Sequence, residues 1–310
     1  MKKWLLIIAL LILLITGVIY FSISSTQKFV AVTSLNCSDG AVNRLMLNQD
    51  EWHRWWPGEK KGNDLYIYKN CNYKIDVIRL NGIEFTIFNT KDSVKGFLEF
   101  TYLDIGSTQL QLSSAFTFAT NPLKRFMKFK QSGEIKENVN LLLDDMKKYF
   151  DKEENIYGMK IVKQASKESS LIATKKTFTH YPSVTEIYDL INSLQQYVLK
   201  KGGEENNPPM LHVHIEVSGI YETMVGLPVK NDLPSEGEYQ LKRMLQGSML
   251  MAEIKGGNYT LMQAEKELDH YISDYKKTSP AIPFQSLVTD RLLETDTSKW
   301  VTQLYYPVFH

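Results

Sequence analysis

The sequence predicts an α+β protein with an N-terminal transmembrane helix, a curved sheet gripping a long helix, and a duplicated βαββ domain with pseudo-twofold symmetry. Three features support this prediction: an uncharged N-terminal run, a series of strands that ends in one amphipathic helix, and a C-terminal half in which one pattern occurs twice. The chain has 310 residues, enough for two ordinary domains and a short extra segment. We expect boundaries at 1–25, 27–150 and 156–310.

The composition is that of a globular protein. Apolar residues make up 43% of the chain and charged residues 23%, with a formal net charge of +1. Nucleic-acid binding depends on clustered positive charge. We therefore expect no nucleic-acid partner.

The N-terminus predicts a membrane anchor. Lys2 and Lys3 precede an uncharged run over residues 4–21, which as a helix would span roughly 27 Å, close to the thickness of a bilayer core. A cleaved signal peptide is the alternative, with Ser22-Ile23-Ser24 as a cleavage site, but its apolar region should be shorter. The lysines place the N-terminus in the cytoplasm and the body outside it, as a single-pass protein.

Two cysteines, Cys37 and Cys71, would then face an oxidising compartment. Two cysteines permit one disulfide bridge but do not require it, so both states stay open.

The region that follows the anchor predicts antiparallel strands and a closing helix. Two short helices, the second containing Trp52, Trp55 and Trp56, follow the first strand. Asn81-Gly82 is a two-residue hairpin signal. A long helix is expected over 135–149, with Val139, Leu142, Leu143 and Met146 on one face. The expected strands are 27–35, 65–68, 73–80, 84–89, 95–103 and 108–119.

This region resembles the helix-grip, START-like family (the SRPBCC superfamily). The matching features are Trp52-x-x-Trp55-x-Pro57, the Tyr66/Tyr68 strand, Asn121-Pro122-Leu123-x-Arg125-x-x-Met127 and the final helix. The resemblance covers about residues 28–150 and implies a pocket for a hydrophobic molecule, or the remnant of one. The three tryptophans form either a ligand gate or ordinary core packing.

The C-terminal half contains one strand–helix–strand–strand unit twice. The apolar positions of the two predicted helices lie 77 residues apart, as Ile191 and Leu268 illustrate. The closing strands lie 79 residues apart, from Pro228 to Pro307. Such internal repetition predicts two half-sheets that meet at a cleft.

This half resembles the GyrI-like, effector-binding module of AraC-type and multidrug-responsive regulators over about residues 158–309. The resemblance implies an aromatic-lined cleft for small, often cationic molecules. The matching segments are Lys255-Gly256-Gly257-Asn258-Tyr259, Thr289-Asp290 and Trp300-Val301-Thr302-Gln303-Leu304-Tyr305-Tyr306-Pro307-Val308.

The chain departs from that family at one position. The family usually has an acidic residue four positions before the final proline, where this sequence has Gln303 and, in the first copy, Met224. Strand alternation places Glu222 on the same face as Met224, so it is either a displaced carboxylate of the cleft or a solvated surface residue. The expected ligand-binding residues are Glu222, Met224, Tyr259, Trp300, Gln303 and Tyr305.

No catalytic residue, metal site or cofactor is expected. His212, His214 and Glu216 alternate along one strand and are either a partial metal-ligand set or a polar strand face. An amide such as that of Gln303 cannot act as a general base at neutral pH.

The predicted function is therefore non-catalytic binding, sensing or carriage of a hydrophobic small molecule by a membrane-anchored protein. Two alternatives stay open: a hydrolase of reactive small molecules that uses the GyrI-like cleft, and an envelope scaffold with filled pockets.

Overall fold

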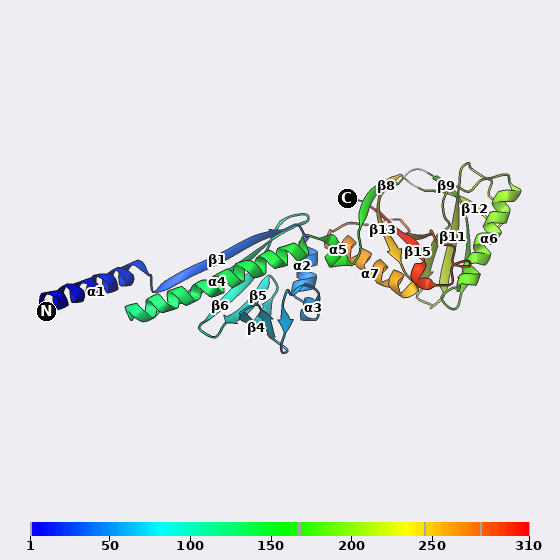
Figure 1. Ribbon diagram of the computed structural model, residues 1–310. Helices are drawn as coiled ribbons and strands as arrows, with labels where there is room; N and C mark the ends of the chain where they lie inside the picture. Colours follow the sequence, from blue (N-terminus) through cyan, green and yellow to red (C-terminus); the bar gives the residue numbers. More distant parts are fainter. Residues whose placement is uncertain (1, 167–168, 245, 280, 310) are drawn as a thin grey trace. The chain divides into compact units, whose positions relative to one another are not determined.

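The computed structural model describes residues 2–166, 169–244, 246–279 and 281–309, with the backbone alone for residues 2, 3, 5, 6, 9 and 19. The chain divides into two compact units, Met1–Lys152 (unit 1) and Glu153–His310 (unit 2) (Figure 1). The division falls within the polar stretch 151–155.

Unit 1 contains a seven-stranded antiparallel sheet in the order β1-β7-β6-β5-β4-β3-β2. The sheet is a meander in which each strand from β2 to β7 pairs with the next, and β1 pairs with β7 over its whole length. Gly82 begins β5 directly after Asn81, at the predicted hairpin. The strands are β1 (Thr26–Leu35), β2 (Glu59–Lys60), β3 (Leu65–Tyr68), β4 (Cys71–Arg79), β5 (Gly82–Phe88), β6 (Ser93–Asp104) and β7 (Ser107–Thr117).

The helix α4 (Pro122–Phe150) closes unit 1 and is 29 residues long. It begins 13 residues before the predicted start, because the Asn121 side chain accepts from the backbone N–H groups of Leu123 and Lys124 and Pro122 occupies the first turn. Its predicted apolar face is confirmed, since Val139, Leu142, Leu143 and Met146 are all buried.

Hydrogen bonds attach α4 to the sheet. The Tyr73 hydroxyl donates to Asn138 Oδ1 at 2.6 Å, and Asn138 Nδ2 donates to the Tyr68 carbonyl at 3.0 Å. The Tyr68 hydroxyl donates to Asp145 Oδ2 at 2.6 Å. The buried amide of Asn138 therefore has partners on both its oxygen and its nitrogen, as a buried polar group requires.

The tryptophans of unit 1 pack as core. They lie on and after α3 (Trp52–Trp55), which follows α2 (Asp39–Met46) and the 3-10 turn η1 (Gln49–Glu51). Trp52 and Trp55 are buried, and their indoles donate to the Met46 and Leu45 carbonyls. Rings of Tyr66, Tyr73, Phe85 and Phe150 contact this group. Of the two interpretations of the tryptophans, the structure therefore supports core packing and not a ligand gate.

Cys37 and Cys71 are both buried, and neither is part of a disulfide. The alternative of a Cys37–Cys71 bridge is therefore absent from this structure.

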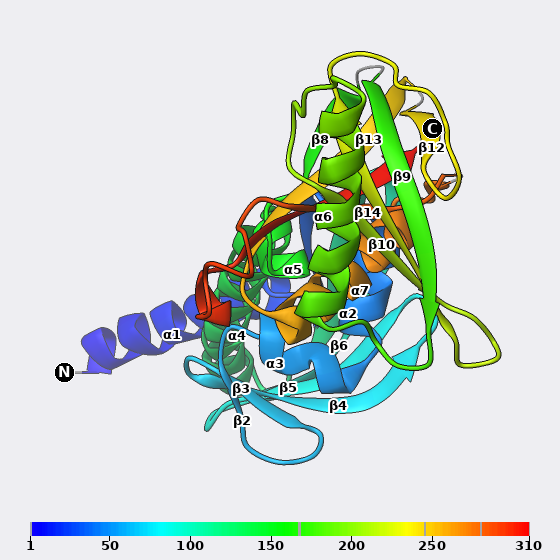
Figure 2. The same cartoon turned by 90° about the vertical axis from the view of Figure 1, so that its right-hand side faces the viewer.

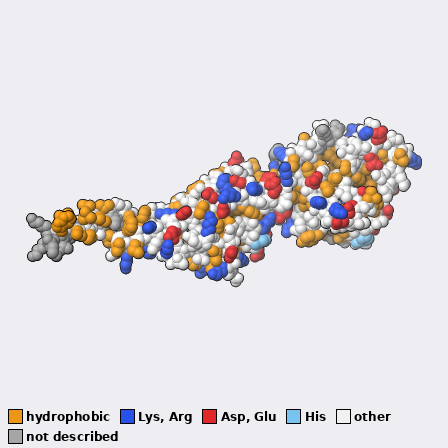
Figure 3. Space-filling model, in the orientation of Figure 1, with side chains coloured by type: hydrophobic (Ala, Val, Ile, Leu, Met, Phe, Trp, Pro, Cys, Tyr) orange, Lys and Arg blue, Asp and Glu red, His pale blue; other side chains and the backbone are white. Residues whose placement is uncertain are grey.

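The helix α1 (Lys2–Ser22) occupies the predicted anchor segment, where apolar side chains gather in Figure 3. Arg125 of α4 donates to the Tyr20 and Ile23 carbonyls at the end of this helix. No helix in the described part of the chain has the length and apolarity needed to cross a bilayer. The predicted membrane anchor and membrane partner, with the single-pass location, are therefore wrong. The side chains of Lys2 and Lys3, which set the predicted orientation, lie outside the described residues.

The START-like assignment of unit 1 stays a prediction. The observed order of strands and helices is compatible with a helix-grip arrangement.

Unit 2 is built on one eight-stranded antiparallel sheet in the order β12-β9-β11-β10-β14-β15-β13-β8. The order is the same from either edge once β12, β9, β11 and β10 are exchanged for β8, β13, β15 and β14. The strands are β8 (Val162–Ser166), β9 (Ser169–Phe178), β10 (Met210–Ile215), β11 (Tyr221–Val229), β12 (Gln240–Met244), β13 (Gly247–Lys255), β14 (Phe284–Leu287) and β15 (Val301–Val308).

The predicted duplication is confirmed by this topology. Each copy is a strand, a helix and two strands: β9-α6-β10-β11 and β13-α7-β14-β15, with α6 (Val184–Lys200) and α7 (Asn258–Asp274). The copies meet where β10 pairs with β14 over only two residue pairs. The short helix α5 (Glu153–Tyr157) and the 3-10 turn η2 (Thr297–Lys299) complete the unit.

Both helices cover the same face of the sheet, as Figure 2 shows for α6. Ile191 and Leu194 of α6 pack with Val225 and Leu227 of β11. The second core contains Leu261 and Leu268 of α7 with Leu304 and Tyr306 of β15. Alternation along β11 and β15 then directs the intervening residues to the face without helices.

Candidate functional site

Unit 2 contains two neighbouring cavities that use different faces of the sheet. The first, here called the helix-side cavity, has a volume of about 500 Å³ and lies between α7 and the strands near the β10–β14 junction. The second, the methionine cavity, has a volume of about 610 Å³ and lies mainly against the face without helices. Both fall in the size range of small-molecule sites.

The helix-side cavity has an aromatic wall and a polar floor. Tyr181, Tyr221, Phe284 and Tyr306 supply the rings, and the rings of Tyr181 and Tyr221 meet edge to face at 6.0 Å. Its full lining is Tyr181, Leu211, His212, Val213, Ile215, Tyr221, Asn258, Leu261, Met262, Glu265, Pro283, Phe284, Gln285, Leu304 and Tyr306.

The floor is a carboxylate–amide pair. Gln285 Nε2 donates to Glu265 Oε1 at 3.0 Å. The Gln285 side chain is buried, and its Oε1 has no hydrogen-bond partner among the described residues. A buried acceptor without a partner costs about 1–3 kcal/mol. Gln285 Oε1 is itself shielded from the cavity, so a bound donor would satisfy it once the amide group turns.

Burial and nearby negative charge shift the pKa values of three side chains in this cavity. Burial raises the pKa of Glu265, while the Gln285 hydrogen bond lowers it and the charge of Asp269 raises it further. Burial also raises the pKa of Tyr181 and, with the negative charges of Asp269 and Glu265, that of Tyr306. The tyrosine hydroxyls therefore stay protonated at neutral pH.

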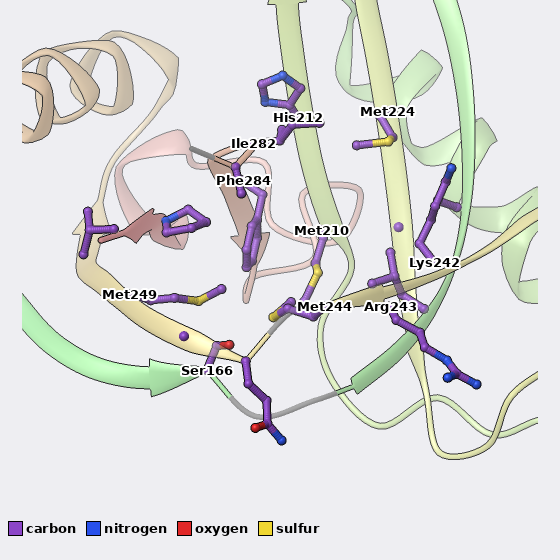
Figure 4. Close-up of a pocket in the computed structure, with 18 of the residues that line it drawn as sticks. Ser166, Met210, His212, Met224, Lys242, Arg243, Met244, Met249, Ile282 and Phe284 are labelled. Carbon is purple, nitrogen blue, oxygen red and sulfur yellow. The ribbon is translucent and has the colours of Figure 1, made fainter. Parts of the chain in front are cut away.

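The methionine cavity is lined by thioethers and apolar groups. Met210, Met224, Met244 and Met249 surround it together with Phe284, and Figure 4 shows their side chains around one space. Its full lining is Ser166, Leu171, Ala173, Met210, Leu211, His212, Met224, Gly226, Lys242, Arg243, Met244, Gln246, Gly247, Ser248, Met249, Ala281, Ile282, Phe284, Pro307, Val308 and Phe309.

Leu211, His212 and Phe284 belong to both linings, so they form the wall between the two cavities. Burial lowers the pKa of His212, although its hydrogen bond to the Pro283 backbone raises it. The imidazole is therefore neutral at pH 7.

Of the six predicted ligand residues, Met224 lines the methionine cavity. Glu222 lies two residues earlier on β11 and forms an ion pair with Lys175, at 3.0 Å between Glu222 Oε2 and Lys175 Nζ. Gln303 and Tyr305 lie on β15, where the Tyr305 hydroxyl donates to Gln303 Oε1 at 2.9 Å and Gln303 Nε2 donates to Glu253.

The other two predicted residues lie elsewhere. Tyr259 on α7 is 77% exposed. Trp300 is buried, its indole donates to the Glu294 carbonyl at 2.8 Å, and the Arg291 guanidinium lies over its ring. These two residues and the Gln303 pair lie outside both linings, so the six residues do not form one site here; their roles in binding stay predictions.

The sequence prediction missed Glu265, Gln285 and Tyr181, and of the four grouped methionines it found only Met224. Glu265 lies beside Leu261 and Leu268 on the packed face of α7, and an acid there was an available signal. The methionines come from four different strands, so no local pattern joins them.

The His-x-His pair does not form a metal-ligand cluster. The rings of His212 and His214 stack at 6.4 Å, and Glu216 follows the end of β10. Within the described ranges, no group of three or more His, Cys, Asp or Glu residues is placed to hold a metal ion.

No family model matches the chain, and no curated protein matches it. Among solved structures, the EcmrR C-terminal domain aligns with 49% of this chain and 98% of its own, at 16% identity and a TM-score of 0.43. A hydrolase from Listeria innocua aligns with 49% of this chain and 92% of its own, at 13% identity and a TM-score of 0.39. By its own strand order, unit 2 fits a GyrI-like fold.

A third structure, the EcmrR–DNA complex, aligns with 61% of this chain and 69% of its own, at 17% identity and a TM-score of 0.44. The DNA in that structure belongs to EcmrR. The prediction that nucleic acid is not a partner of this chain is withdrawn. A net charge near zero describes the whole chain and not the distribution of its charges, so it cannot exclude such a partner.

Proposed function

We propose that this protein binds a hydrophobic small molecule in the helix-side cavity, without catalysis, and thereby senses, carries or sequesters it. The observation that supports this most is an aromatic cavity whose floor is the Glu265–Gln285 pair, in which the buried amide oxygen still has no partner among the described residues. Such a floor suits a ligand with an apolar body and at least one N–H or O–H donor.

The two alternative functions have less support. The predicted cleft residues offer a hydrolase no free base, because Gln303 is an amide and Glu222 is paired with Lys175. Glu265 of the helix-side cavity accepts a hydrogen bond from Gln285. A scaffold with filled pockets would leave little internal space, whereas the two cavities measure about 500 and 610 Å³.

The test uses N-phenyl-1-naphthylamine, an apolar fluorescent amine with one N–H donor, titrated into the whole chain. We expect saturable binding, and we expect Gln285→Leu to weaken it about tenfold, the effect of losing one buried hydrogen bond. Gln240→Leu, at an exposed position of β12, is the matched control and should leave the affinity unchanged.

The site of binding is read from methionine methyl resonances. Met262 is the methionine that lines the helix-side cavity, so its signal should move on titration. Absence of saturable binding, or equal affinities for the wild-type chain and Gln285→Leu, would refute the proposal.

A further inference from the structure

The methionine cavity differs from the helix-side cavity in charge. The described residues that line it include no acidic side chain, but they include Lys242 and Arg243. The helix-side cavity has the opposite character, with Glu265 in its lining and no lysine or arginine among the described lining residues. The two cavities therefore select for ligands of different charge.

Lys242 is the cation available to a ligand. Arg243 forms an ion pair with Asp232 and is directed away from the cavity in Figure 4. Lys242 has no ion-pair partner among the described residues, and its side chain lies on the same side of the cavity as Met224 (Figure 4). It is exposed, so its ammonium group lies where the cavity meets water.

The remaining lining suits a flexible apolar chain. Methionine side chains are unbranched and polarizable, and surfaces rich in methionine adapt to ligands of variable shape. Leu171, Ile282 and Phe284 add apolar surface, and Gly226 leaves the strand β11 without a side chain at this point.

We propose that the methionine cavity is a second ligand site, which takes a single-chain amphiphilic anion with its tail among the methionines and its anionic head group beside Lys242. The site is independent of the helix-side cavity, because the ligand enters from the other face of the sheet. The partly hydrated position of Lys242 limits the desolvation cost of the head group, while burial of the tail supplies most of the affinity.

The experiment compares decanoate, 1-decanol and decylammonium, which share a chain length and differ in charge. The whole chain is labelled with ¹³C at the methionine methyl groups, and each compound is titrated below its micelle-forming concentration. Met210, Met224, Met244 and Met249 report on the methionine cavity, and Met262 reports on the helix-side cavity.

We expect decanoate to move the four signals of the methionine cavity and to leave Met262 in place. Decylammonium should bind roughly tenfold more weakly than decanoate, because Lys242 attracts the carboxylate head group and repels the ammonium head group. Octanoate should also bind roughly tenfold more weakly than decanoate, because each buried methylene contributes about 0.8 kcal/mol.

Lys242→Gln tests the head-group contact. The substitution should abolish most of the preference for decanoate over decylammonium. Lys176 is exposed and lies outside the lining, so Lys176→Gln should preserve the preference. Both sites are at the surface, so folding is unaffected. The proposal is overturned if decanoate moves Met262 instead, if none of the four signals moves, or if Lys242→Gln keeps the full preference.

Discussion

The two copies of the βαββ unit keep the same scaffold and differ in what their helices present to the sheet. Ile191 of α6 and Leu268 of α7 occupy equivalent positions and are both buried. Three residues before each, the copies diverge: Tyr188 stands in α6 and Glu265 in α7. The backbone N–H of Arg291 donates to the Tyr188 hydroxyl at 2.7 Å, whereas Glu265 faces the helix-side cavity.

This difference shows how a duplicated fold acquires one polar site. The apolar positions hold each helix on its half-sheet, so they are retained in both copies. The position beside them is free to differ, and in α7 it carries a carboxylate. The helix-side cavity is therefore asymmetric although the strand order is symmetric.

The largest expected effect tests the equivalence of the two cores. Ile191→Ala and Leu268→Ala each remove a buried aliphatic side chain, so each should lower the free energy of unfolding of unit 2 by about 3 kcal/mol. Urea unfolding of the whole chain, followed by circular dichroism, measures both. The two cores would not be equivalent if one substitution lowered the free energy of unfolding by less than half as much as the other.

A smaller effect is expected at the helix starts, where the copies differ. α6 begins with a capping box formed by Ser183 and Glu186, whereas α7 begins after Gly257 with no side-chain cap. Ser183→Ala should cost about 1 kcal/mol in the same unfolding experiment. Ser193→Ala, inside α6, is the control, and an equal loss there would show that the cap is not the cause.

The smallest effect concerns the pH dependence of stability. Burial raises the pKa of Glu265 above its ordinary value of 4.5. The folded state therefore binds this proton more tightly than the unfolded state, and stability falls as pH rises from about 4.5 through the raised pKa. Tyr188, at the equivalent position, makes no such contribution in this range.

Glu265→Gln should flatten this decline and raise the free energy of unfolding at pH 7.5 by up to about 1 kcal/mol. The amide oxygen can still accept the hydrogen bond from Gln285. Unfolding measured at intervals from pH 4 to pH 8 tests the slope, with Glu238→Gln, at an exposed position, as the control. A slope that Glu265→Gln leaves unchanged would contradict the expectation.

Where the sequence prediction failed, the cause lies in competing signals. The start of α4 was placed at residue 135 because the apolar face becomes regular there, although Asn121 and Pro122 carry the signals of a helix start. Leu123 and Met127 of the first turns are exposed, so they add no apolar periodicity. The cap determined the boundary, and the periodicity determined only which part of the helix is buried.

The sequence by itself determined the duplication, because amphipathic periodicity and the spacing of repeated segments are local properties of the chain. It also determined which face of α4 and of both repeat helices is buried. Only the tertiary structure decided where the cavities lie. Glu265 and Gln285 meet through the packing of a helix on a strand, and Met210, Met224, Met244 and Met249 meet through strand order, which no spacing along the chain encodes.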